Sequence, residues 1–479
     1  MEEMNNKQIY KMTGKYKQHE KDGKFMYINS ERGRWFRSNL SGSNIINLID
    51  GNRSLKELVE SLSVDYNIPV DAIQGDTMAF LKGLVAHKHI CLSHEDTSEI
   101  RSSATNDTLP GSIWIHPNAS CNLNCPYCYN KSGEYKDNKT LNWKDLSGFF
   151  EYIKTKNNGN KKISIVISGG EPTLRPKELK ELIEQLRNTN IINRIALLTN
   201  GTNTSFSLWK DILPLIDVVQ ISLDGATPEV NDKTRSKESF GKVIETIKVI
   251  QSIGSSCYLG ITLTPTKYNI HEIPSFVTLA VKLNVNMVAI SRLRPLGRYK
   301  DNQEIQMNNQ DYISILEEAK KIYQKEHRLF KLKKDDSSTF PVLKLQEMDC
   351  ITKVNFSAKR TNCGAGLGSM SISHNGNVQP CASFYESKFV LGNIFNNTPQ
   401  EILDKALEFG ENHSVDKVEF CQNCDVRHIC GGCCRAISYS LHESPLRADT
   451  SIISLSHKTC GLRDDIYNVM WSMPDYAID

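Results

Sequence analysis

Cysteine is the residue type with the most chemical potential in this 479-residue chain, and its 14 copies are clustered. Cys121, Cys125 and Cys128 follow the apolar run 113–115 in the spacing C-x3-C-x2-C. Nine further cysteines lie between residues 350 and 460. In a reducing cytosol, groups of this kind indicate metal binding rather than disulfides.

The first group predicts an iron–sulfur cluster with an open coordination position. Three thiolates on one loop hold three irons of a [4Fe–4S] cube and leave the fourth iron without a protein ligand. A substrate or cosubstrate can then coordinate that position. The alternative is a zinc loop, but zinc prefers four closed ligands, and no nearby His or Cys completes the set.

The loop Cys121-Asn122-Leu123-Asn124-Cys125-Pro126-Tyr127-Cys128 resembles that of the radical S-adenosylmethionine (SAM) superfamily. The resemblance implies that the three cysteines bind the catalytic cluster and that Tyr127 lies near the adenine of SAM. It implies that SAM chelates the open iron through its amine and carboxylate. The reduced cluster would then cleave SAM to methionine and a 5′-deoxyadenosyl radical, which abstracts hydrogen from a substrate.

Motifs after three successive predicted strands match the SAM-binding positions of that family in the expected order. Gly169 and Gly170 stand at a strand end, where glycines let backbone approach a ligand closely. Glu171 can accept from the SAM ammonium group. Ser222 and Asp224 can face a ribose diol together, although ordinary turn chemistry is the alternative for both. The resemblance implies the SAM contacts Tyr127, Gly169, Gly170, Glu171, Asn200, Ser222, Asp224 and Arg235.

The C-terminal cysteines resemble the SPASM domain, an extension that binds two auxiliary [4Fe–4S] clusters in peptide- and protein-modifying radical SAM enzymes. The resemblance implies two ligand sets, one for each auxiliary cluster. Ligands of the first would be Cys363, Cys381 and Cys434, completed by Cys350. Ligands of the second would be Cys421, Cys424, Cys430 and Cys460.

Three alternatives remain open in this region. The separation of Cys350 from Cys363 departs from the family pattern, so the first auxiliary cluster can instead have an open site. Cys433 stands beside Cys434, although the spacing favours Cys434. A zinc ribbon would use Cys433 with Cys421, Cys424 and Cys430, but its gap is shorter than the usual ~15–20 residues.

Short apolar runs alternate with amphipathic helices from residue 112 onward, which favours a parallel sheet, open or closed into a barrel. The resemblance implies an α/β fold with a partial (β/α)6 TIM-type barrel. We expect strands at 163–167, 195–198, 218–222, 259–263 and 288–291. We expect helices at 177–187, 240–252, 273–283 and 310–326. The segment 371–380 predicts a hairpin, and we assign no role to the basic loop 292–298.

The N-terminal segment predicts a small winged-helix-like domain. Segments 25–28 and 34–37 flank a turn and indicate a β-hairpin, and we expect a helix around 43–49 after it. Ser54 and Glu57 form a capping-box pattern that opens a helix, and a further helix starts near Pro69. This domain resembles the PqqD-like element that recognises leader peptides in ribosomal peptide maturation, which binds the leader as an added strand. A DNA-binding winged helix is the alternative, but no strong basic stripe supports it.

These features divide the chain into residues 15–95 (peptide recognition), 96–110 (linker), 111–335 (radical SAM core) and 336–479 (SPASM-like domain). The net charge of +3 is too even to indicate nucleic acid or a membrane surface as a partner. No apolar run has the ~18 residues of a membrane helix, and no secretory signal is evident. We therefore expect a cytoplasmic protein.

The order of the three domains predicts radical modification of a ribosomally made precursor peptide. Our specific hypothesis is a thioether crosslink from a cysteine sulfur to a carbon. Ring closure onto sulfur removes one more electron, which an auxiliary cluster can accept, and a flavodoxin- or ferredoxin-type donor would reduce the SAM cluster. The alternatives are carbon–carbon crosslinking, epimerisation, maturation of a peptide-derived quinone cofactor, and oxidation of a protein Cys or Ser as in anaerobic sulfatase maturation.

Overall fold

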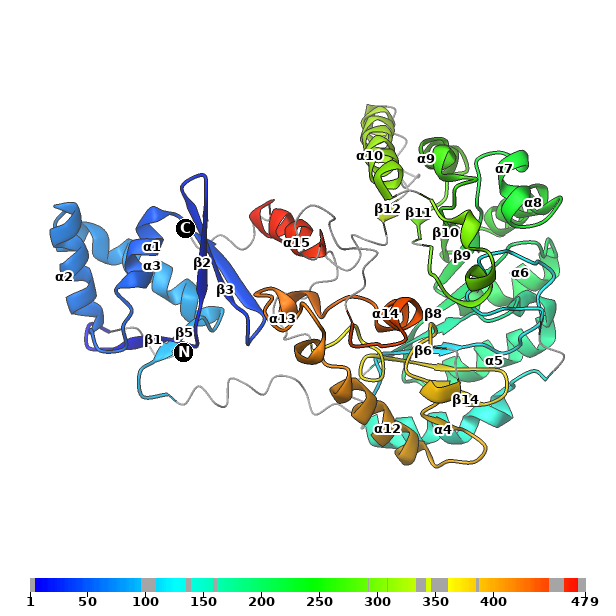
Figure 1. Cartoon of the computed structure of the whole chain (residues 1–479), viewed down its shortest axis with the longest axis horizontal. Helices are drawn as coiled ribbons and strands as arrows, with labels where there is room; N and C mark the ends of the chain where they lie inside the picture. Colours follow the sequence, from blue (N-terminus) through cyan, green and yellow to red (C-terminus); the bar gives the residue numbers. More distant parts are fainter. Residues whose placement is uncertain are drawn as a thin grey trace.

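The structure is a computed structural model with two bulky ends joined by a cysteine-rich middle. An N-terminal domain and an α/β barrel lie at opposite ends of the long axis, and the segment around α13 lies between them (Figure 1). The described residues are 5–95, 109–134, 139–157, 162–291, 293–307, 309–332, 342–345, 361–384, 387–447 and 461–472. Among the helices in these ranges, none combines the length and apolar character that crossing a membrane requires.

The N-terminal domain packs three helices against one face of a three-stranded antiparallel sheet of order β2-β3-β4. Its strands are β1 (Tyr10–Met12), β2 (Lys17–Lys21), β3 (Lys24–Asn29), β4 (Arg34–Ser38) and β5 (Ile90–Leu92). Its helices are α1 (Leu40–Asn47), α2 (Leu55–Tyr66) and α3 (Val70–Ala86). Strands β1 and β5 form a separate antiparallel pair. The sheet therefore has two edge strands, β2 and β4.

The local signals of this domain are confirmed. The Ser54 hydroxyl accepts from the Glu57 backbone N–H at 3.3 Å, and the Glu57 carboxylate accepts from the Ser54 N–H at 2.8 Å. Helix α1 begins earlier than the 43–49 that we expected. The side chain of Asn39 accepts from the Gly42 N–H at 2.8 Å and caps the helix there. The buried face of α2 is Leu55, Leu58, Val59 and Leu62.

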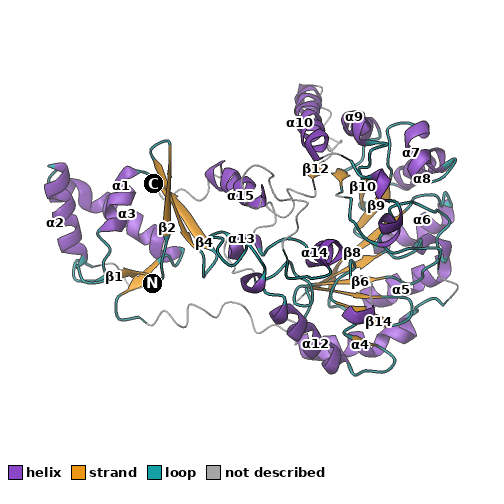
Figure 2. Cartoon of the chain, viewed as in Figure 1, coloured by secondary structure: helices purple, strands orange, loops and turns teal. Residues whose placement is uncertain are grey.

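The barrel is built from parallel strands that alternate with helices, as the sequence predicted (Figure 2). Its strands are β6 (Ser112–Ile115), β7 (Ile163–Ile167), β8 (Ile192–Thr199), β9 (Val218–Ser222), β10 (Tyr258–Leu263), β11 (Met287–Ile290) and β12 (Val342–Leu345). Its helices are α4 (Trp143–Asn157), α5 (Pro176–Asn188), α6 (Phe206–Ile212), α7 (Pro228–Thr234), α8 (Ser239–Ile253), α9 (Ile273–Lys282) and α10 (Asn309–Leu332). The polar motifs follow β6, β7, β8 and β9, so they share one end of the barrel, where such folds carry their sites.

The C-terminal region extends the barrel sheet. Strand β13 (Ser369–Ile372) pairs in parallel with β6, and β14 (Asn377–Gln379) and β15 (Gly392–Asn393) follow as antiparallel neighbours. The β13–β14 pair confirms the predicted hairpin, and the full sheet has ten strands. The helices of this region are α12 (Pro399–Asn412), α13 (Arg427–Cys430), α14 (Arg435–His442) and α15 (Gly461–Ser472). Strand pairing to β6 thus brings the C-terminal cysteines to the first strand of the barrel.

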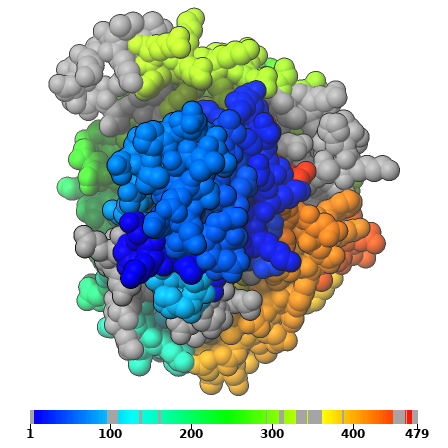
Figure 3. Space-filling view, turned by 90° about the vertical axis from the view of Figure 1, so that its left-hand side faces the viewer, coloured from blue at the N-terminus to red at the C-terminus, as the bar shows by residue number. Residues whose placement is uncertain are grey.

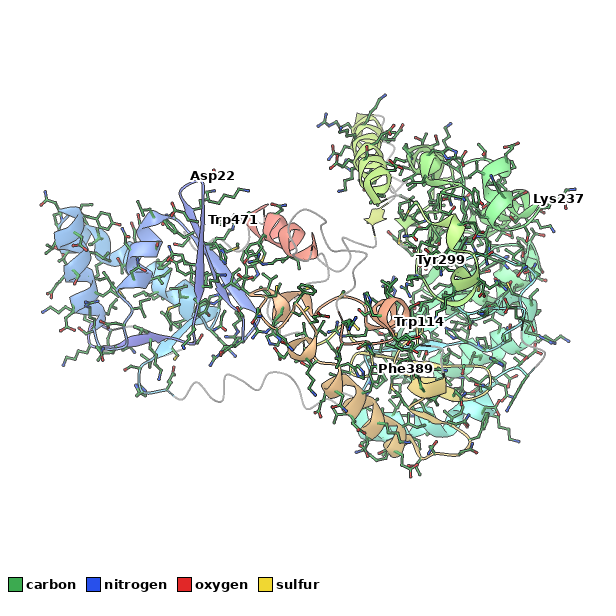
Figure 4. All side chains as sticks on the ribbon, in the orientation of Figure 1. Asp22, Trp114, Lys237, Tyr299, Phe389 and Trp471 are labelled. Atoms are coloured by element: carbon green, nitrogen blue, oxygen red, sulfur yellow. The ribbon has the colours of Figure 1, made fainter. Side chains whose placement is uncertain are left out.

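The second face of the N-terminal sheet packs on this C-terminal region. One buried apolar cluster joins the two: Met26, Ile28, Trp35, Val426, Ile429, Ile466 and Met470. The Arg37 guanidinium donates to the Trp471 carbonyl at 2.7 Å, and Asp22 and Trp471 mark this side of the molecule in Figure 4. The N-terminal domain and the C-terminal residues adjoin in the space-filling view (Figure 3). Strands β3 and β4 of the N-terminal sheet are therefore buried between the domain's own helices and the cysteine-rich region.

Candidate functional site

The first cysteine group lies on the loop after β6 and is partly buried in an apolar cluster. The buried members are Leu123, Cys125, Tyr127, Leu293, Tyr299 and Ile305, and Cys121 and Cys128 pack against them. Burial raises the pKa of the Cys125 thiol to about 11. The charge of Arg235 lowers this pKa, and the neighbouring thiols raise it further. Bound metal ions would instead favour the deprotonated form, because cysteine binds metals as the thiolate. The structure therefore brings together the three thiols that the sequence proposed as ligands.

The Gly169-Gly170 turn lies against this loop. The Gly170 N–H donates to the Asn118 carbonyl at 2.9 Å, and the Glu171 N–H donates to the Ser120 carbonyl at 2.7 Å. A Cβ at Gly170 would lie 2.0 Å from the Ser120 oxygen, and Gly169 has φ +113°. Only glycines fit this contact. The turn therefore supports the cysteine loop through backbone hydrogen bonds.

The Glu171 side chain points into the protein and is 1% exposed. Its carboxylate accepts from the Thr173 N–H at 3.0 Å, the Thr173 hydroxyl at 2.6 Å, the Thr199 hydroxyl at 2.7 Å and the Asn200 N–H at 2.6 Å. Burial raises its pKa, and these hydrogen bonds oppose the rise. The carboxylate thus ties the ends of β7 and β8 together. Its predicted contact to the SAM ammonium group stays a prediction.

Asn200 connects the end of β8 to the cysteine loop. Its side-chain amide donates to the Asn122 oxygen at 2.8 Å and contacts the Cys121 sulfur at 3.9 Å. Asn118, on the opposite flank of the loop, is 2% exposed. Its amide nitrogen donates to the Glu171 carbonyl at 3.3 Å, while its buried oxygen accepts no hydrogen bond from the described residues. A buried acceptor beside the glycine turn suits a ligand that carries N–H donors.

Asp224, Arg235 and Tyr127 form one buried polar group. Asp224 is fully buried and pairs with the Arg235 guanidinium at 2.6 and 3.3 Å. It also accepts from the Tyr127 hydroxyl, and from the Thr264 N–H at 2.9 Å. The Arg235 guanidinium lies over the Tyr127 ring and 3.9 Å from the Cys125 sulfur. Three predicted SAM contacts therefore bind one another, and a fourth, Ser222, is the last residue of β9.

Cys363, Cys381 and Cys434 come together in the C-terminal region. All three pack on the buried residues Leu296, Ala365, Phe384 and Ala436. Burial raises the pKa of Cys381 to about 12, and the neighbouring Cys434 and Cys363 add to the rise. Cys433 points elsewhere, since its sulfur lies 3.9 Å from the Ser438 hydroxyl. Of the two adjacent cysteines, the structure thus places Cys434 with Cys363 and Cys381.

Cys421, Cys424 and Cys430 are the remaining predicted ligands within the described residues, and they lie in or just before the short helix α13. The Cys424 N–H donates to the Cys421 carbonyl at 2.9 Å, and Cys424 and Cys430 pack on the cluster shared with the N-terminal sheet. Cys350 and Cys460, each predicted as a fourth ligand, lie outside the described residues. In the part of the chain that the structure describes, no three His, Cys, Asp or Glu side chains converge on a position for one metal ion.

The cysteine side chains at these sites are the type of ligand that iron–sulfur clusters require. Thiolates are the usual protein ligands of such clusters, and in a cube each binds a different iron. The described thiols gather as one group of three on the loop after β6 and as one group of three in the C-terminal region, and Cys424 and Cys430 share a further cluster. The glycine turn and the buried Asn118 oxygen provide polar backbone and an acceptor for a cosubstrate beside the first group.

Two residues near the cysteines were not predicted as site residues. Arg298 donates to the carbonyls of Cys125 and Ser132, both at 2.9 Å. Tyr129 packs against the cluster that holds Cys363. The only sequence signals were the basic loop 292–298 and the aromatic residue after Cys128, and neither signal indicates a contact by itself.

Comparison with protein-family models covers all three parts of the chain. The radical SAM superfamily model matches residues 115–280. The model for coenzyme PQQ synthesis protein D (PqqD) matches residues 25–90, and the iron–sulfur cluster-binding domain model (SPASM) matches residues 363–425. Together with the cysteine loop and the barrel, these matches define a radical SAM/SPASM enzyme with a PqqD-like N-terminal domain. Its cofactors are SAM and [4Fe–4S] clusters.

The relatives include enzymes named as maturases. Mycofactocin maturase MftC of Mycobacterium tuberculosis (strain CDC 1551 / Oshkosh) is 25% identical over 335 residues, which span 67% of this chain and 77% of MftC. Antilisterial bacteriocin subtilosin biosynthesis protein AlbA of Bacillus subtilis (strain 168) is 26% identical over 330 residues, 65% of this chain and 64% of AlbA. The chain is related to both proteins.

Solved structures share the fold. The structure of anSMEcpe with bound AdoMet has a TM-score of 0.58 at 20% identity and covers 75% of this chain and 96% of its own. Streptococcus suis SuiB bound to precursor peptide SuiA has a TM-score of 0.55 at 16% identity and covers 93% of this chain and 100% of its own. The SuiB match extends over almost the whole chain, so the shared fold is not confined to the barrel.

Proposed function

We propose that this enzyme modifies a ribosomally made precursor peptide by radical chemistry and forms a thioether bond between a cysteine sulfur and a carbon. The PqqD-like domain, joined to a radical SAM core and a SPASM domain, is the observation that carries the proposal. The names of three similar proteins support it: MftC is a maturase, AlbA is a bacteriocin biosynthesis protein, and SuiB binds a precursor peptide. The proposed domain boundaries remain 15–95, 111–335 and 336–479, with the linker at 96–110.

The proposed ligands of the SAM cluster are Cys121, Cys125 and Cys128. When bound there, the reduced cluster and SAM supply a 5′-deoxyadenosyl radical that removes a hydrogen atom from the substrate. The chain's own residues hold the loop in place, because Gly170 and Glu171 bond to its backbone. Asn118 and the Gly169-Gly170 backbone are the proposed contacts of the SAM methionine group.

Arg235 is the proposed partner of the SAM carboxylate. It is 11% exposed at its side chain and lies between Asp224 and Cys125. Asp224 orients the guanidinium by two hydrogen bonds, and it keeps a buried cation paired. In this proposal Asp224 positions Arg235 and Tyr127 by hydrogen bonds. Ser222 and Asn200 keep their predicted roles as SAM contacts.

The proposed auxiliary ligand sets keep the assignments made from the sequence, for three [4Fe–4S] clusters in all. Cys363, Cys381 and Cys434, with Cys350, would hold one, and the proximity of the first three supports this set. Cys421, Cys424 and Cys430, with Cys460, would hold the other. A cytoplasmic flavodoxin- or ferredoxin-type donor is the proposed source of electrons.

The leader of the precursor is proposed to pair with an edge of the N-terminal sheet. Edge strands present unpaired N–H and C=O groups to which an extended peptide can add. Strand β2 is largely exposed and carries charged side chains, whereas β4 is buried at its side chains and lies beside α1. Either edge would hold the leader by main-chain bonds while the core of the peptide reaches the barrel.

Anaerobic turnover of a cysteine-containing peptide encoded beside this enzyme tests the proposal. A thioether removes two hydrogens from the peptide and protects that cysteine from alkylation. Unchanged mass with inverted stereochemistry would indicate an epimerase instead, and loss of two hydrogens with a reactive cysteine would indicate a carbon–carbon bond. No reaction and no cleavage of SAM would contradict the proposal.

Matched cysteine variants test the cluster assignment. The Cys121→Ala/Cys125→Ala/Cys128→Ala variant should fall from about 12 to about 8 irons per chain and lose SAM cleavage. The control Cys257→Ala removes a partly buried thiol outside the three groups, and it should keep both. Stoichiometric zinc with about 4 irons would mean that the C-terminal region is a zinc ribbon.

A further inference from the structure

The segment that follows β11 and runs into the 3-10 turn Gly297–Asp301 touches both cysteine sites. We call residues 293–298 the connector. At its C-terminal end, the Arg298 side chain is 8% exposed. Its Nε donates to the Cys125 carbonyl at 2.9 Å, and its Nη1 donates to the Ser132 carbonyl at 2.9 Å. The same nitrogen pairs with the Glu134 carboxylate at 3.1 Å. One guanidinium therefore binds the cysteine loop at Cys125 and the segment that follows the loop at Ser132 and Glu134.

The backbone of the connector meets the same loop. The Arg298 N–H donates to the Cys128 carbonyl at 3.0 Å. Gly297 has φ +61°, and a Cβ there would lie 2.3 Å from the Cys128 oxygen and 2.5 Å from the Tyr129 carbonyl. A side chain would thus collide with backbone that cannot move aside cheaply. The connector and the loop are therefore in close backbone contact, as both the Arg298 hydrogen bond and the absence of a side chain at Gly297 require.

The other end of the connector reaches the C-terminal cysteines. Leu296 is buried against Ala365, Phe384 and Ala436, the residues on which Cys363, Cys381 and Cys434 pack. The Arg294 guanidinium donates to the Ser383 hydroxyl at 2.5 Å, two residues after Cys381. The Ser440 hydroxyl donates to the Pro295 carbonyl. The connector is therefore fastened to both cysteine regions at once.

We propose that Arg298 is a positioning residue for the loop that carries Cys121, Cys125 and Cys128. We also propose that its buried guanidinium, whose carboxylate partner Glu134 is 46% exposed and screened by solvent, favours the reduced form of the cluster. The proposal rests on the proposed cluster ligands Cys121, Cys125 and Cys128. Hydrogen bonds and net charge around a cluster set its reduction potential, and charges act strongly where water is excluded. Arginine suits this position because it stays charged and its fixed fork can reach several acceptors, whereas lysine carries a point charge.

Two substitutions separate charge from geometry. Arg298→Met removes the charge and all side-chain donors, and Arg298→Lys keeps the charge but loses the fork. The matched control is Arg187→Met. Arg187 likewise donates to a carbonyl, that of Leu215 at 2.7 Å, and pairs with a carboxylate, that of Asp217. It lies on α5, and both of these partners lie just before β9 rather than in a cysteine region.

The measurement is an anaerobic redox titration followed by electron paramagnetic resonance, using the signal that changes when SAM is added, together with iron content. We expect Arg298→Met to lower the midpoint potential on the order of 59 mV, a tenfold weaker one-electron reduction. Arg298→Lys should recover at least half of that shift. Loss of the SAM-responsive cluster alone, about 4 of about 12 irons, in Arg298→Met but not in Arg187→Met would equally support the positioning role.

Three results would overturn the inference. They are a wild-type potential in a fully loaded Arg298→Met enzyme, an equal shift in Arg187→Met, and loss of all iron from Arg298→Met, which would mean a general folding defect. Failure of the underlying assignment looks different. In that case the wild-type enzyme itself shows no SAM-responsive signal, or the variant with Cys121, Cys125 and Cys128 replaced keeps it.

Discussion

Asp425 is the acidic centre of the contact between the N-terminal sheet and the C-terminal region. Its carboxylate is 5% exposed and lies 3.2 Å from both Lys17 and His19 on β2. From α15, Arg463 pairs with it at 3.3 Å, and the Tyr467 hydroxyl donates at 2.5 Å. Burial raises the pKa of Asp425, but the hydrogen bonds from Tyr467 and Arg463 outweigh this and hold the pKa well below its usual range. The group is therefore a carboxylate at neutral pH.

Asp425→Asn should loosen this contact by about 2 kcal/mol at pH 7. The asparagine oxygen can keep the Tyr467 bond, so the loss is chiefly the charged hydrogen bond from Arg463, worth about 1.5–3 kcal/mol. Arg463 is 31% exposed and Lys17 is 59% exposed, so solvent screening reduces the first and leaves little for the second. The apolar contact of Met26 with the Ile466 region remains and keeps the domain attached.

Hydrogen exchange of the loaded, full-length enzyme measures this loosening. A change of 2 kcal/mol corresponds to about 30-fold faster exchange in the segments Lys17–Lys21 and Gly461–Ser472, with α2 unchanged. The control Asp211→Asn breaks an exposed pair with Lys180, 3.3 Å apart, and should have no effect on either segment. Unchanged exchange in Asp425→Asn would refute the reasoning, and so would equal acceleration of α2, because the whole domain would then be unfolding.

Further outcomes follow from single buried positions. Burial lowers the pKa of His89 to about 3, so an unfolded chain binds a proton below pH 6.5 that the folded chain refuses. The stability that His89 contributes is complete above pH 6.5 and falls as the pH drops, by about 2 kcal/mol at pH 5. His89→Gln should therefore reduce the fall in Tm between pH 7 and pH 5. An equally steep fall in the variant would contradict this. Gly170→Ala places a methyl group 2.0 Å from the Ser120 oxygen and should release about 4 irons, whereas the helical control Gly148→Ala has open space and should release none; a fully loaded Gly170→Ala enzyme would count against the packing argument. Glu171→Gln turns one buried acceptor into a donor that faces other donors and should cost about 1–3 kcal/mol in thermal unfolding, so an unchanged Tm would disprove it.

The elements and the cysteine motifs were predictable because their signals are local. The capping box of Ser54 and Glu57 involves neighbours in the chain, and the apolar period of α2 reports which face is buried without any knowledge of the partner. The βα alternation likewise indicates parallel strands, since a crossover helix must connect them. The spacing of Cys121, Cys125 and Cys128 is short enough that one loop brings the thiols together, whatever surrounds it.

Tertiary structure decided the contacts that join distant segments. Whether Cys433 or Cys434 faces Cys363 depends on how the chain turns after Gly431 and Gly432, both with φ near +77°. Spacing favoured Cys434, and the folded chain places Cys434 there. The pairing of Asp224 with Arg235 converts two separate predicted SAM contacts into one buried ion pair.

The longest-range features were beyond any local signal. Strand β13 joins β6 across more than 250 residues, Arg298 reaches back to the Cys125 carbonyl, and Asp425 meets His19. By itself, the sequence determined which residues can bind clusters and which segments form strands and helices, because composition and period act over a few neighbours. Only the folded chain decided which of those residues meet, because such contacts form when the buried faces of remote elements pack against one another.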